Sequence, residues 1–170
     1  RDASTLAIVD PVAGIVIGRV PTVTNPHEIT ASDDGRLAFV ASPTAGISVI
    51  DLEALMEIRR IDIGAGSEPH DVRYAAGKLY FTAEGYKTIG RYDPASNKVE
   101  WLLGIGKDGT HMLVMSEDLN TIFTADRGSN TVTVVDGIAA GPTDSTVTSI
   151  SVGGEGPEGI DLSPDESEIW

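Results

Sequence analysis

The chain has 170 residues, of which 41% are hydrophobic and 22% are charged, a composition typical of a globular domain with a hydrophobic core. Its 26 acidic and 12 basic side chains give a net charge of −14, which disfavours nucleic acid and anionic membrane surfaces as partners. No cysteine is present, and no apolar run reaches the roughly 18 residues of a membrane-spanning helix, so disulfides, thiolate metal sites and helical membrane spans are excluded.

A hydrophobic stretch that ends in aspartate recurs along the chain. It occurs at residues 6–10, 47–51, 88–93 and 132–136, and its closing aspartates are 41, 42 and 43 residues apart. An aspartate at a turn bonds to its own backbone, so we interpret this series as structural: Asp10, Asp51, Asp93 and Asp136.

Two further series keep the same register. Strand-like segments rich in apolar residues occur at 37–41, 79–83, 121–125 and 168–170, and another strand follows each of His27, His70, His111 and Glu158. Each repeat therefore holds four short strands separated by turn residues such as Asp34-Gly35. Four antiparallel strands in a period of about 40–45 residues are typical of one β-propeller blade.

The sequence predicts an all-β fold, with residues 1–170 forming a single β-propeller region of about four blade-equivalents. Residues 1–25 form the end of a blade, 26–66, 67–107 and 108–154 are blades, and 155–170 start another. The last blade is longer, which predicts an exposed loop insertion at 137–146. Arg1 aligns with Arg127 and Trp170 with Phe123, which fits either a four-bladed ring closed by shared termini or, as we favour, a part of a larger ring.

The second strand of each repeat is apolar on both faces, as a sheet covered by neighbouring blades requires. The aromatic side chains are accordingly expected in the core between blades: Phe39, Tyr80, Phe81, Tyr92, Trp101 and Phe123.

All three histidines of the chain occupy one position of the repeat, and the fourth repeat has a glutamate there. Equivalent positions of successive blades surround the central channel, so His27, His70, His111 and Glu158 are expected to meet at one mouth of it. Imidazole and carboxylate together suit a divalent metal, a bound ligand, or a general base with an orienting partner. The alternative is a polar repeat position that only bonds the loop between blades.

A second set of polar residues is expected around this ring. Glu28 and Asp71 adjoin their histidines, while Ser42, Glu84 and Asp126 end the second strands. Glu84 and Asp126 could add carboxylates to a cation site, with Arg127 as a counter-charge. Ordinary strand-end and turn chemistry is the alternative for these residues.

Residues 104–109 match the dinucleotide pattern G-x-G-x-x-G. That pattern needs a following helix to hold a pyrophosphate, whereas the repeat places a strand there, so no nucleotide cofactor is expected. The motifs H-E-x-x-H and G-x-S-x-G are absent.

Two parts of the chain resemble the YVTN-type β-propeller repeat. The first comprises residues 26–29, 33–41 and 47–51, and the second comprises residues 129–136 and 156–165. The resemblance implies a seven-bladed propeller in a secreted or periplasmic protein of bacteria or archaea. Residues 79–84 and 89–94 look more like a blade of streptogramin lyase, and the Pro-His starts are similar to those of lactonase-type propellers.

These observations leave three functional hypotheses. The first is a non-enzymatic module that binds a small molecule or a protein at the channel mouth. The second is a lyase or lactonase-type enzyme whose divalent metal is held by His70, His111 and Glu158 or a neighbouring carboxylate. The third is a haem- or quinone-linked propeller, although without Cys-x-x-Cys-His any haem would come from elsewhere.

Overall fold

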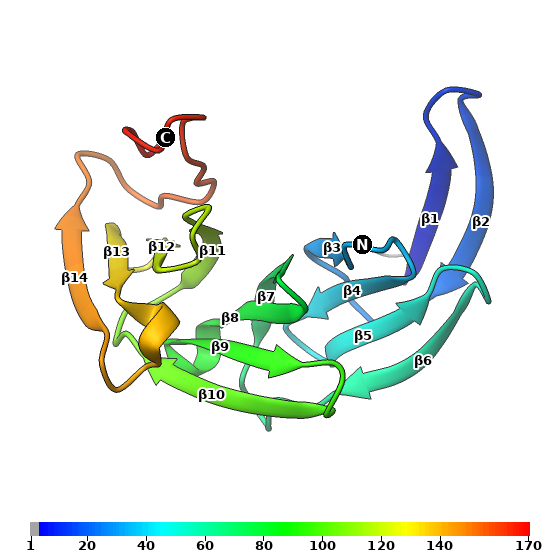
Figure 1. Ribbon diagram of the computed structural model, residues 1–170, viewed down its shortest axis with the longest axis horizontal. Coiled ribbons are helices and arrows are strands. Elements are labelled where there is room, and N and C mark those ends of the chain that lie inside the picture. Colours follow the sequence, from blue (N-terminus) through cyan, green and yellow to red (C-terminus); the bar gives the residue numbers. More distant parts are fainter. Residues whose placement is uncertain (1–3) are drawn as a thin grey trace.

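Antiparallel sheets arranged in an arc make up the fold (Figure 1). The computed structural model describes residues 4–170, so Arg1 and its alignment with Arg127 lie outside the described residues. Within 4–170 the named strands form one two-stranded and three four-stranded sheets. The two-stranded sheet pairs β1 (Thr5–Asp10) with β2 (Ile15–Pro21).

Each four-stranded sheet is a meander of consecutive strands. The first blade comprises β3 (Ile29–Ala31), β4 (Leu37–Ser42), β5 (Gly46–Asp51) and β6 (Met56–Ile61). The second comprises β7 (Pro69–Ala75), β8 (Lys78–Ala83), β9 (Thr88–Asp93) and β10 (Lys98–Gly104). The third comprises β11 (Thr110–Met115), β12 (Thr121–Asp126), β13 (Thr131–Asp136) and β14 (Thr146–Ser151).

The innermost strands of the three blades lie next to one another. β7 contacts β3 and β11, and Figure 1 shows these three strands facing the inside of the arc, with β6, β10 and β14 on the outside. Beyond β14 the chain turns back, and Leu162 pairs with Ile169 in an isolated antiparallel bridge. The all-β fold of four-stranded antiparallel blades predicted from the repeat is confirmed.

The hydrophobic core lies between neighbouring sheets, because β4, β5 and β8 of the first two blades bury side chains on both faces. One cluster joins the first and second blades and includes Phe39, Val72 and Phe81. A second cluster joins the second and third blades through Tyr80 and Leu113. Phe39, Tyr80, Phe81 and Tyr92 are buried as expected, whereas Trp101 and Phe123 are only partly buried.

The segment between β13 and β14 differs from the exposed loop that was expected at 137–146. It contains the 3₁₀ helix η2 (Ile138–Ala140), and Ile138 is 1% exposed within the cluster that joins the second and third blades. Because burial of an Ile side chain contributes roughly 1.5–3 kcal/mol, part of the extra length extends the core. Ile138 is thus a buried exception within the loop insertion predicted at 137–146.

Turns between strands are stabilised by their own side chains. The carboxylate of Asp51 accepts the backbone N–H groups of Glu53 and Ala54, and Asp10 does the same for Val12 and Ala13. At Asp93 a hydrogen bond from the Ser96 hydroxyl, with others from Ala95 N–H and Lys78, lowers the carboxyl pKa to about 2. Among residues 4–170 no helix is long and apolar enough to cross a membrane.

Candidate functional site

A polar pocket of about 680 Å³ lies where the inner strands of the blades begin. From the predicted set it is lined by His27, Glu28, His70, Glu84, His111, Arg127 and Glu158. Asn25, Pro43, Met112 and Gly159 also line it, and the sequence carried no signal that singled these out. Asp71, Asp126 and Ser42 are not part of its wall.

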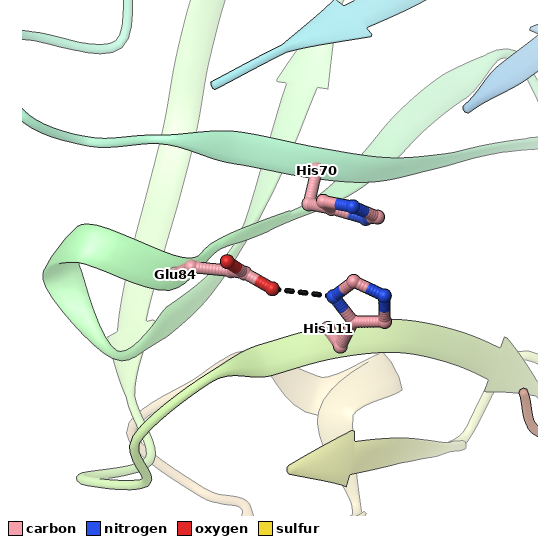
Figure 2. Close-up of side chains that lie close together, drawn as sticks. All are labelled: His70, Glu84 and His111. Carbon is pink, nitrogen blue, oxygen red and sulfur yellow. Dashed lines mark hydrogen bonds and ion pairs between the residues drawn. The ribbon is translucent and has the colours of Figure 1, made fainter. Parts of the chain in front are cut away.

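The three imidazoles and one carboxylate form a continuous row. His27 Nδ1 lies 2.6 Å from His70 Nε2, and the His70 and His111 rings are 3.8 Å apart between centroids. His111 Nδ1 lies 2.5 Å from Glu84 Oε1, the contact dashed in Figure 2. His70 is 4% and His111 8% exposed, so the row runs from the half-buried His27 into a largely desolvated interior.

Two β-bulges direct histidines toward the pocket. The register of β7 with β8 shifts between Pro69 and Val72, and that of β11 with β12 shifts between Thr110 and Met112. His70 and His111 lie within these irregularities, where an extra residue re-aims the side chain. His27 precedes β3 as expected, but His70 and His111 lie inside their strands, one residue after the start.

Hydrogen bonds between blades lock the two buried histidines in place. The Thr82 hydroxyl donates to the carbonyl of His111 at 2.9 Å and accepts the Asp71 N–H at 2.9 Å. The Asp71 carboxylate in turn accepts the N–H of Leu113 at 2.8 Å. Sequence reasoning missed the role of Thr82, because a threonine in a strand looks like any other β-former.

Asp71 therefore joins neighbouring blades and is not part of the pocket wall. It is 1% exposed, and burial raises its carboxyl pKa, against the opposing effects of the Leu113 N–H and of Arg73 at 3.5 Å. The N–H of Val72 also donates to it. Its role is to satisfy backbone groups at the bulge.

Asp126 likewise turns away from the pocket and into its own blade. Its carboxylate accepts hydrogen bonds from Thr124, Thr131 and Thr133, and the residue is fully buried. Burial raises the Asp126 carboxyl pKa, opposed by these three hydroxyl donors and by Lys107. Asp126 and Asp71 were predicted as possible carboxylates around the ring, and the structure places neither there.

Replacing Asp126 by asparagine is expected to alter how stability depends on pH. Because its folded-state pKa is raised, the folded protein binds this proton more tightly than the unfolded chain, and the resulting stability is lost as pH rises through the folded pKa. The amide keeps the volume and bonds threonine hydroxyls without titrating. Urea denaturation between about pH 4 and 8 measures the effect. The free energy of unfolding of Asp126→Asn is expected to increase relative to that of the wild type as pH rises.

Asp165→Asn provides a control of opposite sign at lower pH, so the denaturation series is extended down to about pH 2. Hydrogen bonds from Ser163 and Ser167 lower the pKa of this carboxyl to about 2, so its contribution is present above the unfolded pKa and is lost as pH falls. The raised pKa of Asp126 is contradicted if the free energy of unfolding of the wild type instead increases relative to that of Asp126→Asn as the pH rises.

Glu84 occupies a different register position from the one expected. Ser42, Ala83 and Asp126 pair with the first residues of the third strands of their blades, so Ala83 holds the strand-end position. Glu84 lies one residue further on, at the start of the 3₁₀ helix η1 (Glu84–Tyr86). This offset explains why Glu84 faces His111 while Asp126 points inward.

Glu158 lies at the pocket rim, although it shares the repeat position of the histidines. Its side chain is 61% exposed and forms an ion pair of 2.9 Å with Arg127. This hydrogen bond raises the Arg127 pKa. The residues closest to the buried histidines are thus Glu84 and His27, and Arg127 with Glu158 borders the opening.

His70, Glu84 and His111 are close enough to hold a metal ion together. Each offers one donor atom, and these atoms all lie within 4.8 Å of one another. By contrast, the glycine-rich stretch at 104–109 runs from the end of β10 into β11, without a helix that could bind a pyrophosphate.

Comparison with known proteins supports the fold. No family model matches the chain. The E3 ubiquitin-protein ligase MYCBP2 of Danio rerio is 29% identical over 108 residues, which covers 52% of this chain and only 2% of that protein.

Solved structures match nearly the whole chain. A chain of hydrazine synthase from Kuenenia stuttgartiensis superimposes with a TM-score of 0.81 at 19% identity, covering 98% of this chain and 48% of that one. A chain of the mitotic checkpoint complex gives 0.83 at 14% identity, covering 99% and 52%. A functionally unknown protein from Desulfotomaculum acetoxidans DSM 771 gives 0.76 at 14% identity, covering 99% and 56%. The chain spans about half of each of these structures, and the similarity establishes a β-propeller-like fold.

Proposed function

We propose that the chain is a non-enzymatic binding module of a secreted or periplasmic protein, and that it takes a polar small molecule or a protein segment at the channel mouth. The observation that carries the proposal is the pocket of about 680 Å³, in which side chains from all three blades meet. A volume of this size suits a small ligand, and a few convergent polar groups supply specificity.

The charges at the opening favour a ligand that has both hydrogen-bond donors and acceptors. Glu28 and Glu158 present carboxylates, and Arg127 presents the guanidinium that forms the 2.9 Å ion pair with Glu158. Because this pair is largely exposed, it contributes at most about 1 kcal/mol to stability and can open to a ligand at little cost. The secreted location and a total of seven blades rest on the resemblance to YVTN-type repeats.

A library of polar compounds tests the binding proposal. Ligand-observed NMR of the intact protein in a chelating buffer is expected to find compounds that bind the wild type and bind Arg127→Ala roughly tenfold more weakly, as expected for one lost charged hydrogen bond. Arg36→Ala is the control, since Arg36 is exposed in the turn at the opposite end of β4. The proposal fails if no compound binds, or if hits bind Arg127→Ala and wild type equally.

A second candidate is a metal-dependent enzyme of the lyase or lactonase type. The proximity of His70, Glu84 and His111 favours it, because a metal with an open coordination position polarises a carbonyl and activates water. If this candidate is correct, the Zn²⁺-loaded protein hydrolyses γ-butyrolactone and His70→Ala/His111→Ala does not. Equal rates for the two proteins would eliminate it.

A further inference from the structure

Two imidazoles and a carboxylate stand together in the least exposed part of the channel mouth. His70 lies on β7, Glu84 starts η1 and His111 lies on β11, so the group draws on two blades (Figure 2). The side chains of His111 and Glu84 are 10% and 15% exposed. We infer that His70, Glu84 and His111 bind one divalent transition-metal ion directly, with Zn²⁺ the best match to this donor set. This inference deepens the proposed function, because it concerns the same pocket.

The donor set determines the class of ion. Imidazole nitrogen and carboxylate oxygen are ligands of Zn²⁺, and three protein ligands leave a fourth position for water or a ligand. Ca²⁺ and Mg²⁺ prefer six or more oxygen ligands, which this group does not supply. All three residues line the pocket of about 680 Å³, so a molecule in the mouth would be able to reach the bound ion.

The distances require only small movements of side chains. Ligand atoms of a tetrahedral zinc ion lie about 3.3 Å apart, given bonds of about 2.0–2.1 Å. The donor atoms of the three residues lie within 4.8 Å of one another, and His111 Nδ1 and Glu84 Oε1 are 2.5 Å apart. An ion between them would replace the His111–Glu84 hydrogen bond and draw His70 inward.

The backbone beneath these ligands is held from both sides. Thr82 of β8 donates to the His111 carbonyl and Asp71 of β7 accepts the Leu113 N–H, so both strands are bonded to β11. η1 is tied to the loop before β7, since Glu84 N–H donates to the Glu68 carbonyl and Gly85 N–H to that of Ser67. Sites with such support hold their ligands near the required geometry before the ion arrives.

His27 completes the arrangement from outside the ligand set. Its Nδ1 lies 2.6 Å from His70 Nε2, so it fixes the orientation of the His70 ring. Ligating histidines commonly have such a partner on their second nitrogen, and its loss costs roughly 10- to 100-fold in metal affinity. We therefore assign His27 a positioning role.

Metal titration of the intact protein tests the inference. After chelation and removal of the chelator, calorimetric titration with ZnCl₂ is expected to show one ion per chain. CoCl₂ is expected to give the visible absorption of cobalt in a four- or five-coordinate site. Glu84→Gln and His111→Ala are each expected to weaken Zn²⁺ binding by at least about 100-fold, more than the loss of an outer-shell partner.

Matched variants separate ligation from folding. Glu53→Gln removes an exposed carboxylate far from the pocket and is expected to leave Zn²⁺ affinity unchanged. Glu84→Gln keeps the size of the side chain, so its result decides the matter if His111→Ala fails to fold. The inference is overturned if Glu84→Gln binds Zn²⁺ as the wild type does, or if Glu158→Gln abolishes binding and Glu84→Gln does not.

The two proposals fail separately. The compound library is screened in chelator, whereas the zinc titration contains no organic ligand. If compounds bind but zinc does not, only the proposed metal site is contradicted. If zinc binds but no compound does, only the proposed ligand binding is contradicted.

Discussion

Replacing Phe81 by alanine is expected to lower the free energy of unfolding by about 3–5 kcal/mol. Phe81 is 0% exposed and lies in the cluster that joins the first and second blades. Its ring covers Gly90, where a Cβ atom would lie 2.3 Å from Phe81 Cζ. The neighbouring strands cannot close over the vacated space without breaking their hydrogen bonds, so a cavity would remain.

Urea denaturation of the intact protein measures this effect. Val12→Ala is the control, because Val12 is 96% exposed in a turn and its truncation should change stability by no more than about 0.5 kcal/mol. Gly90→Val in the Phe81→Ala background should restore part of the loss by refilling the space. Equal stabilities for Phe81→Ala and Val12→Ala would show that the blades do not pack through this ring.

Replacing Gly85 by alanine is expected to disturb both stability and the pocket. A Cβ on Gly85 would lie 1.9 Å from the Gly66 carbonyl oxygen, so η1 must separate from the loop before β7. Such overpacking costs about 1–3 kcal/mol. Since Glu84 is the adjacent residue, the shift also draws its carboxylate away from His111, and we expect weaker Zn²⁺ binding.

Gly104→Ala is the matched control for this substitution, because a Cβ there meets no atom within 4 Å. Thermal unfolding and zinc calorimetry of the two variants give the comparison. If Gly85→Ala retains the stability and Zn²⁺ affinity of Gly104→Ala, η1 does not position Glu84.

The repeat period was sufficient to predict the blades and the meeting of the histidines. Closing aspartates 41–43 residues apart recur only if each repeat is one structural unit, and equivalent positions then face a common axis. His27, His70 and His111 do lie in one row for that reason. Their involvement in metal or ligand binding stays a prediction.

The direction of the surrounding carboxylates could not be predicted in the same way. An offset of one residue places Glu84 beyond the end of β8, and three threonine hydroxyls hold Asp126 inside its blade. Asp71 lies within a bulge, which alternation of side chains along a strand does not reveal. Side-chain direction at strand ends depends on such local shifts, and these leave no mark in the spacing of the repeat.

The row of histidines lets the residues that line the channel mouth change independently of one another. Each blade contributes one histidine to the row from the same position of the repeat, so a substitution in one repeat changes one wall of the pocket. The cores between blades, which contain Phe81 and Leu113, need not change with it. The ligand selectivity of the pocket can therefore change by substitutions in one blade at a time, while the packing between blades stays the same.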